Sequence, residues 1–309
     1  MLRRVAQAEK TQKPDEDEDS AYARLKASRE SLVDSYEEIG GKAESRLRSI
    51  KLIERGEQVQ INRIEGYLPG RIVQFVMNLN FGEQKFVFTR HGQSEYNTTE
   101  QIGGDSRLSP AGEEYALALA EFAKKKICKD ENGKILRSRL WTSSLRRTIM
   151  TARHIEQPVV PPDEDCDLEW IQMRPRVWRN LDEIYAGVCD GMTYKQIEQE
   201  YTAEFKARSL DKLSYRYPRG ESYLDVIQRL DPIVQEMQRC KQPLLVVGHQ
   251  GILRILYAYF IGIDRDKAPK LSIPLNTVIC LDTTMNNCHE HREQLIGALS
   301  KSQLDAPSI

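Results

Sequence analysis

Two histidines and two arginines occupy positions from which they could transfer a phosphoryl group. His91 and His249 each lie just past an apolar run typical of a buried strand; Arg90 precedes the first, and Arg147 lies past a third such run. A neutral imidazole can attack phosphorus and carry the phosphoryl group covalently, while guanidinium groups hold phosphate oxygens. A lone Arg-His-Gly tripeptide arises by chance, but the second histidine favours an anion pocket with a nucleophilic nitrogen.

Strands and helices alternate from Lys85 onward, and this alternation predicts how the four residues come together. Apolar runs predict strands at 86–88, 140–142, 243–247 and 277–281. Helices are expected from 109–110, from about 145, and over 192–207, 221–240 and 252–261. This order is typical of an α/β domain with a mainly parallel sheet, in which ligands bind beyond the carboxyl ends of the strands. Residues 157–180 carry four prolines, which indicate a loop or an insertion.

Length, charge and cysteine content limit the classes of protein to consider. The 309 residues allow two compact units. The 45 basic and 46 acidic side chains give a net charge of −1, which argues against a mainly electrostatic nucleic-acid binder. The apolar runs are too short to span a membrane, and we expect no secretory signal. Six scattered cysteines without a C-x-x-C pair favour free thiols and a cytoplasmic location.

A resemblance to a known family rests on several blocks of sequence. Residues 89–95, Thr-Arg-His-Gly-Gln-Ser-Glu, resemble the signature of the histidine phosphatase superfamily. Blocks in the same order over about 85–285 resemble the bisphosphatase half of the bifunctional 6-phosphofructo-2-kinase/fructose-2,6-bisphosphatase family; they include 102–105, 141–143, 181–184, 215–223 and 249–250. The resemblance implies a phosphoglycerate mutase-like α/β fold with three layers: a mostly parallel central sheet and helices on both faces. It implies no cofactor and no metal.

The resemblance also implies roles for single residues. His91 would be the nucleophile that forms phosphohistidine. Glu183 would be the general acid that protonates the leaving fructose C2 oxygen and then helps to activate water. The groups around the transferring phosphoryl group would be Arg90, Arg147, Asn97 and His249. The groups around the rest of the substrate, with its 6-phosphate, would be Ile102, Gly103, Tyr194, Arg208, Lys212, Arg216, Tyr223, Gln250 and Arg254.

Taken singly, these residues have plainer interpretations. Arg208, Lys212 and Arg216 are spaced by four and could form a solvated helix face. Glu183 could be a surface carboxylate, and the tyrosines could lie at the edge of the core. The run at 288–291, Cys-His-Glu-His, is more simply a solvated tract than a metal site. Departures from the family pattern lie at Gln93, Tyr185 and Asn276 and in the long 157–180 segment.

Four segments are expected along the chain. Residues 1–55, with the acidic run 15–19, should be a charged, largely flexible tail that resembles the end of a kinase domain, and residues 56–82 a linker strand and helix. The phosphatase domain should span 83–285, and a C-terminal tail 286–309. Because the sequence lacks the P-loop pattern G-x-x-x-x-G-K-[ST], we expect no kinase activity.

The expected function is hydrolysis of the C2 phosphate of fructose 2,6-bisphosphate. A broader sugar-phosphate phosphatase or phosphoglycerate mutase-like enzyme is the first alternative. The second alternative is a weakly catalytic regulatory module that binds sugar phosphates. The expected partner is the sugar bisphosphate, with no nucleic acid and no membrane; a homodimer, or association with a bifunctional homologue, is also considered.

Overall fold

The computed structural model describes residues 18–34, 45–56, 58–80, 82–163, 167–284 and 287–297. The chain divides into two compact units, Met1–Val73 and Gln74–Ile309. Within the described residues, no helix is both long and apolar enough to cross a membrane.

The first unit contains helix α2 (Glu18–Asp34) and an antiparallel hairpin of β1 (Ser49–Ile53) and β2 (Gln58–Asn62), joined by the 3-10 turn η2 (Glu54–Gly56). Helix α3 (Tyr67–Asn78) continues from it into the second unit. The expected strand and helix of the linker are present. The expected boundary at residue 55 is wrong, because β1 lies before it and pairs with β2 after it. The acidic run 15–19 lies largely outside the described residues.

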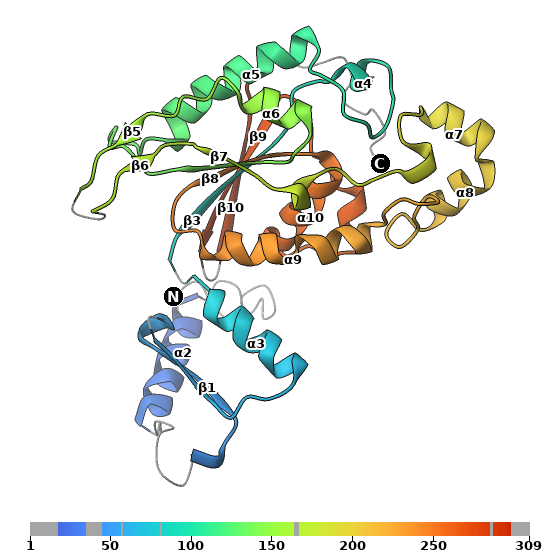
Figure 1. Cartoon of the computed structure of the whole chain (residues 1–309). Helices are drawn as coiled ribbons and strands as arrows, with labels where there is room; N and C mark the ends of the chain where they lie inside the picture. The colour runs from blue at the N-terminus through green and yellow to red at the C-terminus, as the bar shows by residue number, and fades with distance from the viewer. Residues whose placement is uncertain are drawn as a thin grey trace. The chain divides into compact units, whose positions relative to one another are not determined.

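A six-stranded sheet in the order β10-β9-β3-β8-β4-β7 forms the centre of the second unit (Figure 1). The parallel strands are β3 (Gln84–Arg90), β8 (Leu244–Gly248), β4 (Arg139–Thr142) and β7 (Pro175–Val177). Strand β9 (Thr277–Thr284) runs antiparallel to β3, and β10 (Asn287–Gln294) runs antiparallel to β9. Residues 286–309 are therefore not all a tail, because eight of them complete the sheet.

Alternate strand residues build two separate cores, one on each face of the sheet. Val87, Leu140 and Leu245 pack with α5 (Pro110–Phe122) and the end of α6 (Arg146–Ala152). Phe88 and Val246 pack with α9 (Tyr223–Arg239) and α10 (Gln250–Ile261). Successive side chains of a strand point to opposite faces, so apolar runs of this kind are buried on both sides. The predicted three-layer α/β fold is confirmed.

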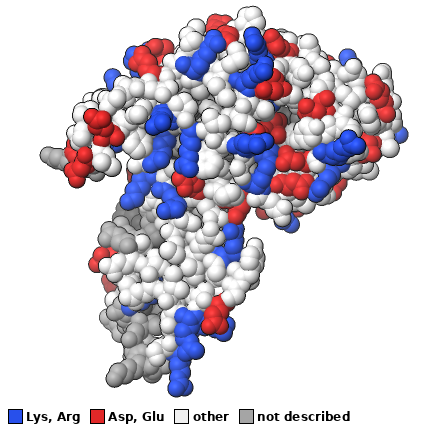
Figure 2. Space-filling view, viewed as in Figure 1, with Lys and Arg blue, Asp and Glu red and all other residues white. Residues whose placement is uncertain are grey.

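Shorter elements complete the second unit. These are α4 (Glu95–Thr98), the π-helical turn η3 (Ala123–Ile127), β5 (Val159–Val160), β6 (Trp170–Ile171), η4 (Arg179–Leu181), η5 (Gly187–Cys189), α7 (Tyr194–Glu200), α8 (Thr202–Leu210) and η6 (Ala268–Lys270). The single helix expected at 192–207 is in fact α7 and α8, which meet at Tyr201. Figure 2 shows basic side chains interspersed with acidic ones over this unit, in keeping with the net charge of −1.

Candidate active site

The two strand-end histidines lie side by side because β3 and β8 are parallel neighbours. The backbone N–H of His91 donates to the carbonyl of Gly248 at 3.0 Å, which ties the end of one strand to the end of the other. The ring centroids of His91 and His249 are 5.2 Å apart, and both side chains are buried. The next position, Gly92, lies so close to α5 that an added Cβ would be 2.5 Å from the carbonyl oxygen of Gly112. A glycine is therefore needed beside the first histidine.

The hydrogen bond of His91 determines which of its nitrogens is nucleophilic. Its Nδ1 lies 2.7 Å from the carbonyl oxygen of Gly92, which can only accept, so Nδ1 carries the proton. In the neutral ring, Nε2 then holds the free lone pair. Burial lowers the pKa of His91 well below its usual 6.5, and the charges of Arg147 and Arg90 lower it further. The imidazole is thus held in its neutral form, with the lone pair of Nε2 free to attack.

His249 has the opposite tautomer. The Nε–H of Arg147 donates to His249 Nδ1 at 3.2 Å, so the proton of the neutral ring is on Nε2, which lies 2.7 Å from the Ser143 hydroxyl. Burial, together with the charges of Arg147 and Arg90, lowers the pKa of His249. Arg147 is itself oriented by a second bond, from Nη1 to the carbonyl of Gly104 at 2.6 Å. Ser143 and Gly104 received no role from the sequence, although both lie in the blocks that carry the resemblance.

Arg90 brings a second buried guanidinium to the histidines. Its Nη1 donates to the carbonyl of Ile273 at 3.0 Å, while its Nε is buried without a hydrogen-bond partner among the described residues. Burial and the charges of Arg254 and Arg147 lower the pKa of Arg90 to about 10, a shift that the carboxylate of Glu183 opposes. A buried cation with an unused donor is suited to a bound anion.

Glu183 approaches this group from the loop between η4 and η5. Its Oε1 accepts the N–H of Ile184 at 3.0 Å, and its Oε2 accepts the N–H of Gly251 at 3.3 Å. A Cβ at residue 251 would lie 2.6 Å from Glu183 Oε1, so only glycine at the start of α10 leaves room for this carboxylate. Glu183 also lines a pocket of about 640 Å³ together with Arg147 and Gly103.

A second group of cations comes from the last turn of α8, the turn that follows it, and α10. Arg208 and Arg254 are buried; Arg254 donates to the carbonyl of Leu271 at 2.5 Å and to the hydroxyl of Tyr223 at 3.2 Å. Lys212 is half-buried, and burial lowers its pKa to about 7, with further contributions from Arg254 and Arg208. Burial raises the pKa of the Tyr194 phenol, and the nearby charge of Arg208 opposes this rise. Five predicted residues thus gather in one region.

Four other predicted residues differ in how they are placed. Gln250, at the first position of α10, has a buried Oε1 without a partner in the described part of the chain. The Oδ1 of Asn97 is used to cap α4, accepting from the N–H and hydroxyl of Ser94. The backbone of Ile102 is bonded to residues 191 and 192, and Gly103 packs on Asp190.

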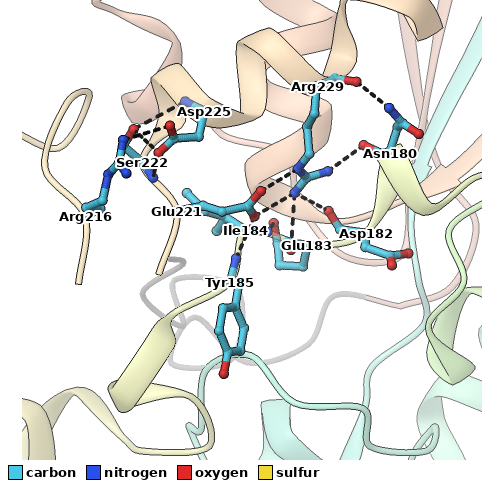
Figure 3. Close-up of polar contacts among 10 residues, drawn as sticks. All are labelled: Asn180, Asp182, Glu183, Ile184, Tyr185, Arg216, Glu221, Ser222, Asp225 and Arg229. Carbon is cyan, nitrogen blue, oxygen red and sulfur yellow. Dashed lines mark hydrogen bonds and ion pairs between the residues drawn. The ribbon is translucent and has the colours of Figure 1, made fainter. Parts of the chain in front are cut away.

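Arg216 is not brought to the cationic group. Its side chain is 59% exposed and forms an ion pair with Asp225 at 2.8 Å (Figure 3).

Comparison with known proteins places this geometry in a family. The model of the histidine phosphatase superfamily (branch 1) matches residues 86–294. The chain belongs to this superfamily. A model of 6-phosphofructo-2-kinase matches residues 5–83 of this histidine phosphatase. The resemblance of the main domain to the phosphatase half of the bifunctional family, and of the N-terminal part to the kinase half, is therefore confirmed.

Relatives of this histidine phosphatase carry names that point to one substrate. A 6-phosphofructo-2-kinase/fructose-2,6-bisphosphatase of Arabidopsis thaliana is 42% identical over 80% of the chain and 31% of its own length. A fructose-2,6-bisphosphatase of Saccharomyces cerevisiae is 40% identical over 80% of the chain and 50% of its own length. A human bifunctional relative is 36% identical over 90% of the chain and 54% of its own length. The chain therefore spans about half, or less, of the curated relatives it matches.

Solved structures confirm the fold of this histidine phosphatase. A putative alpha-ribazole-5'-P phosphatase of Escherichia coli has a TM-score of 0.56 at 20% identity and covers 70% of this chain and 99% of its own. The mycobacterial glucosyl-3-phosphoglycerate phosphatase has a TM-score of 0.53 at 23% identity and covers 68% of this chain and 97% of its own.

Proposed function

We propose that the chain is a fructose-2,6-bisphosphate 2-phosphatase that releases fructose 6-phosphate and phosphate. The observation that carries the proposal is the presence of two groups of cationic side chains, only one of which lies against the strand-end histidines. His91 lies with Arg90 and Arg147, while Arg208, Lys212 and Arg254 form the second group. A substrate with two phosphates could place one at each group, and the relatives' names specify such a substrate.

In the first step, the Nε2 lone pair of His91 forms a bond to phosphorus as the bond from phosphorus to the C2 oxygen breaks. The electron pair of the broken bond goes to that oxygen, which takes the carboxyl proton of Glu183. Arg90 and Arg147 hold the phosphoryl oxygens while charge develops on them. Fructose 6-phosphate leaves, and His91 carries the phosphoryl group.

In the second step, water attacks the phosphorus of phosphohistidine. The water oxygen bonds to phosphorus, the electron pair of the N–P bond returns to Nε2, and one water proton goes to the Glu183 carboxylate. Phosphate leaves, and His91 and Glu183 regain their starting forms. The 6-phosphate group at the second cationic group would fix the sugar so that binding energy far from phosphorus orients the reacting bond.

Rapid-quench trapping tests the proposal. The chain is mixed with fructose 2,6-bisphosphate labelled at the C2 phosphate and stopped in alkali within milliseconds. We expect labelled protein to form and decay at the rate of turnover, and His91→Ala to form none. His289→Ala, which replaces an exposed histidine on β10, is the matched control and should behave as wild type. Unchanged turnover in His91→Ala would show that the nucleophile is assigned wrongly.

A substrate panel separates this function from a broader phosphatase. We expect kcat/KM for fructose 2,6-bisphosphate to exceed that for sugar monophosphates and phosphoglycerates by at least about 100-fold, because a monophosphate leaves one cationic group unfilled. Similar values across the panel would favour the broader enzyme. Turnover below about 0.01 per second with tight binding would favour a regulatory binding module.

Kinase activity, assembly and location remain for experiment. We expect no transfer of phosphate from ATP to fructose 6-phosphate by this chain, since it has no P-loop pattern. Sedimentation of the purified chain tests for a homodimer, and co-purification with a bifunctional homologue tests for the mixed assembly. Fractionation of cells tests the cytoplasmic location.

A further inference from the structure

Arg229 of α9 binds the backbone of the segment that carries Glu183. Its Nη1 donates to the carbonyl of Asn180 at 2.5 Å, and its Nη2 donates to the carbonyls of Asp182 at 2.7 Å and Glu183 at 3.4 Å (Figure 3). The side chain of Asn180 returns a bond to the Arg229 carbonyl at 2.6 Å. A helix of the scaffold thus holds the residues on the N-terminal side of Glu183.

The same guanidinium extends the attachment to the other side of Glu183 through Glu221. Arg229 Nε and Nη2 donate to the two oxygens of the Glu221 carboxylate at 2.7 and 3.0 Å. That carboxylate accepts the N–H of Tyr185 at 3.0 Å, and the N–H of Glu221 donates to the Tyr185 carbonyl at 2.8 Å. Residues 180–185 are therefore held on both sides of the carboxyl group.

A further set of hydrogen bonds joins residues 180–185 to the loop before α6, the helix that carries Arg147. The Asp182 carboxylate accepts the N–H of Ser144 at 2.7 Å and also its hydroxyl. Ser144 lies between β4 and α6, the helix that carries Arg147. A shift of the segment away from α9 would consequently change the distance between Glu183 and the groups that hold the phosphoryl oxygens.

We propose that Arg229 is a positioning residue for Glu183, fixing the carboxyl group from which the proton passes to the leaving oxygen. The inference rests on the proposed function only in taking Glu183 as the acid. The planar fork of Arg229 reaches acceptors in several directions at once, whereas a lysine ammonium could keep the charge opposite Glu221 but not this set of carbonyls. Arg229→Lys therefore removes positioning while retaining charge.

The chemistry of the leaving group supplies a readout that a merely structural residue would not change. The C2 oxygen of a sugar is a poor leaving group and needs the Glu183 proton as its bond to phosphorus breaks. The 4-nitrophenolate ion is a good leaving group and departs without that proton. Loss of position at Glu183 should therefore slow the first step for the sugar phosphate and affect the aryl phosphate little.

The experiment compares single-turnover formation of phosphohistidine from fructose 2,6-bisphosphate and from 4-nitrophenyl phosphate. We expect Arg229→Lys to be slower by about 10- to 100-fold with the sugar bisphosphate, the effect of a displacement near 1 Å, and by less than about 3-fold with the aryl phosphate. KM for the sugar bisphosphate should change little. Glu183→Gln should show the same pattern, and Glu236→Gln, which removes another ion pair of α9, should match wild type.

Several outcomes would overturn the inference. They are an unchanged rate in Arg229→Lys, or an equal loss with both substrates accompanied by a lower unfolding temperature. Wild-type protein that hydrolyses other alkyl phosphates but not fructose 2,6-bisphosphate would refute the proposed function alone, and the comparison of alkyl with aryl substrates would still test Arg229.

Amide exchange tests the positioning role without turnover. The N–H groups of Ile184 and Gly251 donate to Glu183, so they should exchange faster in Arg229→Lys. Unchanged exchange at both would contradict the inference.

Discussion

Replacing Lys212 by methionine separates two effects of this side chain. One is the loss of stability from burying an ammonium group, and the other is the contribution of that group to binding phosphate. Lys212 lies in the turn after α8, half-buried beside two other cations. Burial, followed by the charges of Arg254 and Arg208, lowers its pKa from 10.5 to about 7. The folded chain therefore holds an ammonium group in a place that disfavours its charge.

The size and sign of the effect on stability follow from that pKa. The lowering of the pKa from 10.5 to about 7 corresponds to a free-energy cost of at most about 5 kcal/mol for holding the charged form in the folded chain. Because the side chain is long and partly exposed, solvent reduces this cost to about 1–3 kcal/mol. Below pH 7 both folded and unfolded chains hold the proton, so the cost is complete. Between about pH 7 and 10.5 only the unfolded chain holds it, so stability rises with pH and the cost disappears above this range.

Lys212→Met should consequently be more stable than wild type by about 1–3 kcal/mol at pH 6.5, with the difference shrinking toward zero near pH 10.5. The same variant should bind substrate less well: loss of a charged hydrogen bond to phosphate should raise KM about 10-fold or more at pH 6.5. In wild type, KM should rise above pH 7 as the ammonium loses its proton, whereas KM of the variant should follow only the titration of the substrate.

Urea unfolding at pH 6.5, 8 and 10, with initial rates at the same pH values, measures both effects. Lys206→Met replaces an exposed lysine of α8 and should change neither quantity with pH. The reasoning fails if Lys212→Met is less stable than wild type at pH 6.5, or if its stability difference is the same at every pH.

Three other substitutions test the geometry of the site. Gly251→Ala should lower kcat by about 10- to 100-fold in steady-state assays, because the new Cβ would displace the Glu183 carboxylate. Ser143→Ala should lower kcat about 10-fold and the free energy of unfolding by about 1 kcal/mol, since His249 loses its Nε2 partner. Arg216→Ala should change KM by less than about 2-fold, because an exposed ion pair holds this side chain away from the cationic group.

A control variant for each of these three substitutions tests the physical reason given for its effect. Gly70→Ala adds a methyl group where nothing lies within 4 Å, so it should leave kcat unchanged. Ser143→Thr keeps the hydroxyl and should restore part of the rate that the alanine variant loses. Arg208→Ala should raise KM about 10-fold or more, in contrast to Arg216→Ala. Equal KM values for the two arginine variants would contradict the placement described above.

The sequence predicted the part of the site that parallel strands determine. His91 and His249 follow strands that carry unbroken apolar runs, and the carboxyl ends of parallel neighbours meet at one edge of a sheet. The hydrogen-bond partners of these histidines were not predictable in the same way. Ser143 and Gly104 act through a hydroxyl and a backbone carbonyl, whose direction depends on loop conformation rather than on residue type.

The spacing of four residues among Arg208, Lys212 and Arg216 allowed a shared helix face, but the helix ends before the second of them. Helix α8 ends at Leu210, and the Asp211 carboxylate then accepts the N–H groups of Leu213 and Ser214, which closes a turn. Only Arg208 lies on the helix, where it is buried, whereas Lys212 is half-buried and Arg216 is exposed beyond the end of the helix. A solvated helix face is therefore wrong for Arg208, while Arg216 is exposed and paired with Asp225.

Burial of several cations around the histidines links two requirements of the proposed chemistry. Phosphate binding favours arginines with unused donors, and Arg90 supplies one. Phosphoryl transfer requires a neutral imidazole, and the charges of Arg90 and Arg147, added to burial, lower the pKa of His91. A water-exposed pocket would weaken both effects, because solvent screens the charges and hydrates the imidazolium. The two buried cores that bring β3 and β8 together thus also create the low-dielectric setting in which the same arginines are placed to bind an anion and to keep the imidazole of His91 unprotonated.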